Sequence, residues 1–350
     1  MKTITFNFLA LFLLLPIASI ASGPRGKYTK ERKISKVYNV SPTALLDVDN
    51  RYGNVYVTTW DKNQTSIDVV ITVNGNDEAL VVKRFNSIDV NFNASQNNVS
   101  ADTEIRNISC ENVGMEINYT IKIPKRSPVT IENEYGGIIL GKIYGAANLN
   151  CKFGDIKAEE LNDTKNILKM EYCGASRIGY WKGGNVLAKF SGVYIDKGEE
   201  INVNAEYTNV IIDEINTIKH DCKYGDLLIK SGNTITGTCD YLQMKVGNVS
   251  SLLNVTINYG NINVQHVDPK IKAVYINATY TGINFKYDEN FAYTFVFSLS
   301  YGNLNGGNNL KFTEKKEKMM SATYKGYHKS ATGSSVTIRS EYGDINLKTT

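Results

Sequence analysis

Thirteen aromatic residues recur at nearly constant spacing along the chain, and this periodicity constrains its fold more than any other feature. From Tyr135 onward, successive members are 17 to 23 residues apart, and most are followed by Gly or another small or polar residue and then by Asn, Asp or Gly. A repeat of this length over so many copies indicates a solenoid, in which each coil packs on its neighbours. The thirteen are Tyr52, Tyr135, Phe153, Tyr172, Phe190, Tyr207, Tyr224, Tyr241, Tyr259, Tyr280, Tyr301, Tyr324 and Tyr342.

The residues around each aromatic alternate between apolar and polar. Apolar side chains occupy the positions two before, three after and five after, as with Cys222, Leu227 and Ile229 around Tyr224. This period of two is typical of strands with one buried face, and the Gly and Asn or Asp after the aromatic supply backbone freedom for a sharp bend. The sequence therefore predicts an all-β fold: a single-stranded parallel β-helix, or solenoid, of about 17–23 residues per coil, preceded by an antiparallel β module.

The residue just before the aromatic gives an independent check on the stacking. If successive coils stack as parallel strands roughly 4.8 Å apart, a charge here lies between its equivalents in the two neighbouring coils, where like charges would repel. The observed signs alternate without a break, so this column is predicted to face solvent and to fix the register of the strands. Its members are Glu134, Lys152, Glu171, Lys189, Glu206, Lys223 and Asp240.

The repeat period vanishes between Tyr52 and Tyr135, where longer alternating runs replace it. The segment from Asp49 to Val55 reads as a first coil that this insertion separates from the others. Strands of an antiparallel sheet are expected over residues 65–73, 87–94, 98–105 and 115–123, and one short helix over 77–85. We therefore divide the chain into a signal peptide (1–21), an N-terminal β module that includes the first coil and the insertion (22–130), and the solenoid repeats (131–350).

The N-terminus has the layout of a secretory signal peptide, with Lys2, an apolar run from Phe6 to Ile17, and small residues that indicate cleavage after Ala21. The apolar run is short for a membrane span, and no later segment is long and apolar enough for one. The mature chain is therefore expected to be exported, to the periplasm or the cell surface, without a transmembrane segment. Its 39 basic and 35 acidic residues form no dense basic face, so nucleic acid is not an expected partner.

The five cysteines give no sign of a metal site. Their count is odd and no C-x-x-C spacing occurs, which argues against zinc and against a dense disulfide framework. Cys222 and Cys239 occupy the same inward column in adjacent coils, so either a disulfide or two stacked buried thiols would have a structural role. The glycine pairs lack the strand-to-helix context of phosphate binding, and we predict no cofactor and no metal.

Toward the C-terminus the spacing loosens. The Lys-rich segment from Lys311 to Met320 is expected to project from the stack as a charged loop. The chain ends directly on the repeat around Tyr342 with no cap after it, which would leave a strand edge able to pair with another molecule. The alternative function, a self-associating scaffold, would use this edge for end-to-end stacking into filaments, which Ile345→Pro would abolish.

The orientation of the repeat aromatics decides whether they can bind a ligand. By alternation with the inward column they are predicted to face the core or to lie at a corner, as an aromatic ladder that stabilises the stack. If the bend turns them outward instead, they would form a flat stripe able to stack on sugar rings or protein surfaces. Tyr180 and Trp181, in an expected loop, are the individual candidates for an exposed contact.

Catalytic chemistry finds little support in the sequence. A polysaccharide-active β-helix would need clustered acids, but those of the bend column, Asp155, Asp226 and Asp344, are several coils apart, with about 19 Å between the first two. The three histidines occupy different positions in their repeats, with no nucleophile or metal-ligand pattern beside them. No catalytic residue is predicted among His220, His266 and His328.

The order of these features resembles a known family. The phrase from Tyr119 to Pro124, the following segment from Val129 to Ile138 and the repeated aromatic-Gly-Asp/Asn-Ile units are similar to the DUF4097 family of proposed adhesins, which are exported bacterial proteins. The resemblance covers most of the mature chain, and the Asn-rich and Lys-rich composition is similar to that of Bacteroidetes members. It implies a surface or periplasmic binding role without catalytic residues.

We therefore predict a non-enzymatic exported solenoid that acts as an adhesin or envelope-binding module, with an unidentified protein or glycan as its ligand. The alternative is a self-associating structural scaffold of the periplasm or envelope. A polysaccharide-active β-helix enzyme is the third possibility. Twelve or so coils would give a rod roughly 60 Å long.

Overall fold

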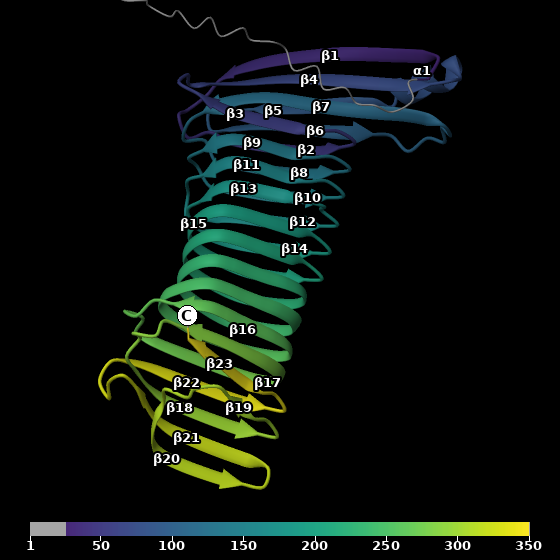
Figure 1. Cartoon of the computed structure of the whole chain (residues 1–350). Coiled ribbons are helices and arrows are strands. Elements are labelled where there is room, and N and C mark those ends of the chain that lie inside the picture. Colours follow the sequence, from purple (N-terminus) through teal and green to yellow (C-terminus); the bar gives the residue numbers. More distant parts are fainter. Residues whose placement is uncertain (1–25, 350) are drawn as a thin grey trace, which may run out of the picture.

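The computed structural model describes residues 26–349, which form a rod of stacked β-coils (Figure 1). The expected signal peptide lies outside the described residues. The strands belong to one continuous sheet that winds around the long axis. Each coil contributes one strand that ends at the repeat aromatic and one that follows it, and we name the two resulting walls the leading face and the trailing face. The predicted parallel β-solenoid is confirmed.

Parallel strands in close register build both faces. The leading face begins with β2 (Leu45–Arg51), β8 (Val129–Glu134), β10 (Ala147–Lys152), β12 (Asn166–Glu171) and β14 (Gly184–Lys189). The trailing face begins with β3 (Val55–Trp60), β9 (Ile138–Ile143), β11 (Ile156–Leu161) and β13 (Ser176–Trp181). Three longer strands then run through the corners and supply both faces, namely β15 (Gly192–Glu206), β16 (Asn209–Val267) and β17 (Ala273–Tyr287).

The insertion widens the N-terminal end of the rod (Figure 1). On the trailing side, β4 (Gln64–Gly75) pairs antiparallel with β1 (Tyr28–Asn39) on one side and with β7 (Val113–Pro124) on the other, and β7 pairs parallel with β3. On the leading side, β5 (Ile88–Ala94) and β6 (Asn98–Ile105) pair antiparallel, and β6 joins β2. The expected strands and the helix α1 (Glu78–Phe85) are all present. However, the strands divide between two faces and do not form one antiparallel sheet.

The core is a continuous stack of apolar side chains from both faces. The inward columns predicted around the aromatic are buried in nearly every coil. Ala175 is an exception, because the coil after Tyr172 has one extra residue before its next strand. Ser176 takes the inward place there, and its Oγ accepts a hydrogen bond from the backbone N–H of Ile156 at 2.9 Å.

The aromatic residue itself makes the bend in each coil. Twelve repeat aromatics have a left-handed φ between 48° and 60°, a region that costs a non-glycine residue roughly 1–2 kcal/mol. The glycine that often follows, to which the sequence pattern assigned the bend, serves by lacking a Cβ. At Gly154, for example, a Cβ would lie 1.9 Å from the carbonyl oxygen of Gly136.

Asn and Asp recur two residues after the aromatic because their side chains join successive corners. The Oδ1 of Asn54 accepts a hydrogen bond from the backbone N–H of Gly137 at 2.8 Å, one coil further along. The same bond recurs between Asn209 and the N–H of Asp226 at 3.1 Å. These residues therefore hold the stack together at its corners.

The C-terminal coils are stacked out of sequence order. The last two strands, β22 (Ser334–Glu341) and β23 (Ile345–Thr349), lie between β17 on one side and β18 (Tyr293–Ser300) with β19 (Leu304–Asn305) on the other. Figure 1 places the C-terminal end in the body of the rod. The expectation of an uncapped last coil is therefore wrong, and end-to-end pairing through that coil has no free edge to use.

The expected charged loop is also wrong, because Lys311–Lys318 forms a strand, β20. It pairs antiparallel with β21 (Ser321–His328), which pairs with β18, so this hairpin covers the far end of the rod. Four lysines on β20 make an edge that discourages further strand pairing. Tyr324, which the spacing placed among the repeat aromatics, lies on β21 and packs edge-on against Phe312 at a centroid distance of 5.8 Å.

Candidate binding surface

A shallow groove runs along the outer surface of the leading face. It consists of three depressions of about 240, 350 and 570 Å³. The first two share Asn150 in their linings, and the last two share Lys169, Leu187 and Asn204. We name it the leading groove. It follows the outward column three residues before the aromatic, whose members are Asp49, Glu132, Asn150, Lys169, Leu187, Asn204 and Asp221.

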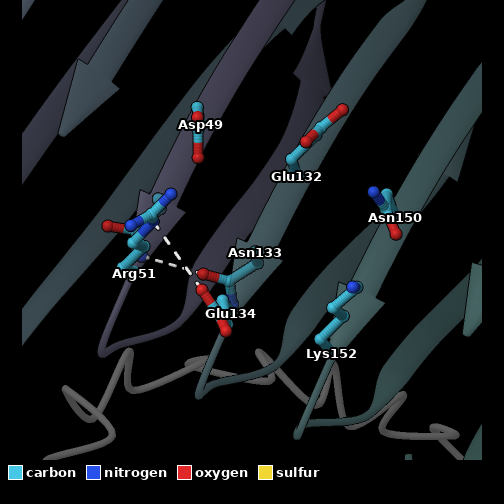
Figure 2. Close-up of a pocket in the computed structure, with 8 residues that line it drawn as sticks. Asp49, Arg51, Glu132, Asn133, Glu134, Asn150 and Lys152 are labelled. Atoms are coloured by element: carbon cyan, nitrogen blue, oxygen red, sulfur yellow. Dashed lines mark hydrogen bonds and ion pairs between the residues drawn. The ribbon is translucent and has the colours of Figure 1, made fainter. Parts of the chain in front are cut away.

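One rim of the groove is the predicted charge ladder. Ion pairs join neighbouring coils, with N···O distances of 3.7 Å for Arg51 and Glu134 (Figure 2), 3.1 Å for Lys152 and Glu171, and 3.3 Å for Lys189 and Glu206. The alternation is therefore confirmed, and Arg51 extends it by one coil. The hydrogen bond to Glu171 raises the pKa of Lys152. Because these pairs are exposed, they fix register more than they add stability.

In the column three residues before the aromatic, the N-terminal end of the groove brings like charges together. Asp102, Asp49 and Glu132 stand directly opposite one another on β6, β2 and β8, a row that we name the acid row. Burial raises the pKa of Asp49, the charges of Asp102 and Glu132 raise it further, and Arg51 opposes them. Burial also raises the pKa of Asp47, as do Glu132 and Asp102. This end of the groove therefore places like charges at directly opposite positions, which disfavours the ionised form of Asp49.

Sequence reasoning missed the acid row. Asp49 and Glu132 stand at the same offset from Tyr52 and Tyr135, and that shared offset was the available signal. Asp102 belongs to the insertion, whose strands have no repeat aromatic to set their register, so its place beside Asp49 depends on the folded structure.

We expect Asp49→Asn to stabilise the protein at pH 7 by about 0.5 kcal/mol, because it removes like charges from directly opposite positions. Since the folded-state pKa of Asp49 is raised, the wild-type protein recovers this stability as the pH falls below that pKa. The two proteins should then be equally stable near pH 3. Urea unfolding followed by circular dichroism at both pH values measures the difference. Asp226→Asn, away from the row, is the matched control. An equal gain in unfolding free energy from Asp49→Asn at both pH values would contradict the explanation.

Twelve repeat aromatics form one continuous ladder at the corner where each leading strand ends. Adjacent ring centroids are 4.6–5.1 Å apart and ring planes differ by 2–11°. Each side chain is 37–53% exposed, so the ladder lies at a corner and outside the core. Its order is Tyr52, Tyr135, Phe153, Tyr172, Phe190, Tyr207, Tyr224, Tyr241, Tyr259, Tyr280, Tyr342 and Tyr301.

The stacking determines what this ladder can contact. The rings within it cover one another's faces and present their edges and hydroxyl groups to solvent. A sugar ring stacks on an aromatic face, so the interior of the ladder does not offer the flat stripe that an outward orientation would suggest.

The two individual candidates occupy different environments. Trp181 is fully buried at the end of β13, where its Nε1 donates a hydrogen bond to the carbonyl oxygen of Glu200 at 3.1 Å. Its proposed exposed contact is therefore wrong. Tyr180 is half-buried on the same strand, and its hydroxyl donates a hydrogen bond to Glu199. Tyr180 remains accessible at its edge but does not line the leading groove.

The remaining reactive side chains are mostly buried. All five cysteines are free thiols in residues 26–349, including Cys222 and Cys239, and burial raises the pKa of Cys222 to about 12. No group of His, Cys, Asp and Glu in this part of the chain is arranged to hold a metal ion.

The leading groove offers exposed carboxamide, carboxylate and ammonium groups, which recognise polar ligands by hydrogen bonds and charge.

Within the described residues, no helix is long and apolar enough to cross a membrane. No curated protein matches this chain. Among solved structures, the chain is similar to a proposed adhesin of Parabacteroides distasonis, with 12% identity, a TM-score of 0.40, and coverage of 73% of this chain and 97% of the other. A proposed cell adhesion protein of Clostridium sporogenes has 10% identity and a TM-score of 0.20, with 92% and 100% covered.

The family model described as Toastrack DUF4097 matches residues 39–348, from the end of β1 to the last strand. This span includes the insertion, all coils of the solenoid and the terminal hairpin. The chain therefore belongs to the Toastrack DUF4097 family.

Proposed function

We propose that this protein is an exported, non-enzymatic binding rod that acts as an adhesin or envelope-binding module. The leading groove is the observation that carries the proposal, since it is an open surface of charged, amide and apolar groups that continues over seven coils. A parallel stack holds such groups at fixed spacing, which lowers the entropy cost of binding an extended partner. The signal-like N-terminal sequence supports export.

The placement of the ionisable groups supports a role without catalysis. Asp155 and Asp226 lie in coils that are four steps apart, too far to act on one glycosidic bond. His220 and His328 are buried, with exposed fractions of 2% and 1%, and the Nε2 atom of each is buried, so neither imidazole is placed for proton exchange with a bound substrate.

Antibody labelling of an epitope inserted between Met319 and Met320 tests the cellular location. This turn of the terminal hairpin is the most exposed place on it, with Met319 96% exposed. We expect intact cells of the native host to be labelled. Labelling only after permeabilisation would contradict a surface adhesin and would restrict the binding role to the periplasm.

Catalysis is tested by incubating the purified protein with envelope polysaccharides and measuring the release of reducing ends or unsaturated sugars. We expect no release. Release that disappears in Glu132→Gln, an acid-row variant, would contradict the non-enzymatic proposal.

A further inference from the structure

The tyrosines of the aromatic ladder are not equivalent, because Phe153 and Phe190 divide them into three groups. Tyr52 and Tyr135 form an isolated pair, and Tyr172 stands alone between the two phenylalanines. Beyond Phe190, seven tyrosines stack without interruption, a group that we name the tyrosine run. In stacking order it contains Tyr207, Tyr224, Tyr241, Tyr259, Tyr280, Tyr342 and Tyr301.

The geometry of the run brings reactive ring carbons of neighbouring coils close together. Adjacent centroids are 4.6–5.1 Å apart and the ring planes differ by 3–10°. Because equivalent rings repeat by translation along the axis, each carbon next to a hydroxyl-bearing carbon lies about one strand spacing from its equivalent in the next ring. The side chains are 39–53% exposed, so a small oxidant reaches their edges and the rings have room to tilt.

We propose that the tyrosine run is a site of oxidative modification, at which a one-electron oxidant forms dityrosine bonds between neighbouring coils. Each of two tyrosines gives one electron to the oxidant and its phenolic proton to water, which leaves two phenoxyl radicals. The radicals couple through a new carbon–carbon bond at the positions ortho to the oxygens. The two ortho hydrogens then move to the oxygens and restore the phenols. The balance is a loss of two electrons and two protons, both electrons accepted by the oxidant.

Stacking favours coupling within the run over coupling elsewhere. A radical formed on any tyrosine of the run has a second tyrosine stacked against it. Electron exchange between stacked rings carries the oxidised state along the run. The same radical at Tyr172 meets a phenylalanine on each side, which has no hydroxyl and does not yield dityrosine. Each bond joins two coils covalently, so the modified rod resists separation of its coils.

The test oxidises the full chain at low protein concentration by brief photolysis of ruthenium tris-bipyridyl with persulfate, which takes up the electrons and becomes sulfate. Cross-linked peptides are then mapped by mass spectrometry. We expect links between neighbours in the run and between Tyr52 and Tyr135, with Tyr342 linked to both Tyr280 and Tyr301. Tyr144 and Tyr275 are 44% and 40% exposed but lie outside the ladder, so they serve as exposure-matched controls. Equal cross-linking at these two residues would overturn the proposal.

Two substitutions within the ladder sharpen the test, and both keep a stacked ring at the position. Tyr241→Phe removes two of the six neighbouring pairs of the run, which with the Tyr52–Tyr135 pair is two of seven, so the dityrosine fluorescence should fall by roughly 30%. Phe190→Tyr connects Tyr172 to the run and should create new links from residue 190 to Tyr172 and to Tyr207. Unchanged link patterns in both variants, or links that are mainly between molecules, would overturn the proposal.

Discussion

Acidification from pH 7 to pH 4 is expected to lower the free energy of unfolding by about 3 kcal/mol through His220 alone. The imidazole is 2% exposed, and burial lowers its pKa to about 4. Its pKa in the unfolded chain is near 6.5, so the unfolded state takes up the proton first. The stability that depends on neutral His220 is therefore present above pH 6.5 and is lost as the pH falls toward 4.

The surroundings of His220 explain why its charged form is disfavoured. Its Nδ1 donates a hydrogen bond to the carbonyl oxygen of Thr238 at 3.1 Å, while Nε2 has no partner among the described residues. Protonation would place a second N–H in the core without an acceptor, which adds to the cost of burying the charge. Val203 occupies the same inward position one coil earlier. The imidazole fits because Gly237 stands beside it, where a Cβ would lie 2.7 Å from the ring.

Denaturant unfolding of the wild type and of His220→Leu at pH 7, 6, 5 and 4 measures this effect. The substitution changes packing, so the informative quantity is the slope of the unfolding free energy against pH, which should become flatter in the variant. His266→Leu, at a half-buried histidine, is the matched control and should keep the wild-type slope. Parallel pH profiles for the wild type and His220→Leu would contradict the assignment.

Much of the solenoid could be predicted from the sequence because its physical determinants are local and repeated. The aromatic marks each corner, the apolar columns mark the buried faces, and the alternating charges from Glu134 to Asp240 report which residues lie side by side. Opposite charges are placed together only if the coils are in register, so this column carries information on tertiary structure that propensities lack.

The failures arose where neighbours in space are not neighbours in the repeat. Equal spacing does not distinguish Tyr324, on an antiparallel strand, from a true ladder member such as Tyr342. Trp181 was expected in a loop, but it ends β13, where the inward positions change phase, with Ser176 and Ile178 buried two apart and Trp181 three further on. A strict period of two cannot detect such an irregularity.

The leading groove could not be predicted for a different reason. Its depth depends on how side chains of unequal size from seven coils meet on one surface, for example Lys169 beside Leu187. The sequence showed that these columns face outward, but the depressions between their side chains form only when the coils are stacked. The outward, edge-on orientation of the aromatic ladder likewise depends on the left-handed backbone at the aromatic itself.

Ile345→Pro is expected to destabilise the C-terminal coils by about 3–5 kcal/mol. Ile345 is fully buried, and its backbone N–H donates a hydrogen bond to the carbonyl oxygen of Asn303 at 2.9 Å. Proline removes this donor and most of the buried side chain. Because β23 pairs with β17 at Ile283 and with β19 at Leu304, its loss removes the strand pairing of β19 and leaves β17 paired there with β16 on one side only. The damage should therefore spread in both directions along the rod.

Hydrogen exchange followed by mass spectrometry locates this damage. We expect Ile345→Pro to lose protection in β17, β18, β19 and β22, while the coils from β8 to β14 keep theirs, because each coil depends mainly on its immediate neighbours. Ile345→Val keeps the N–H and should cost about 1 kcal/mol, with unchanged exchange in those strands. If the strand lay at a free end, proline there would change self-association and leave β18 and β19 protected. That result in light scattering and exchange would refute the inserted position of the last coil.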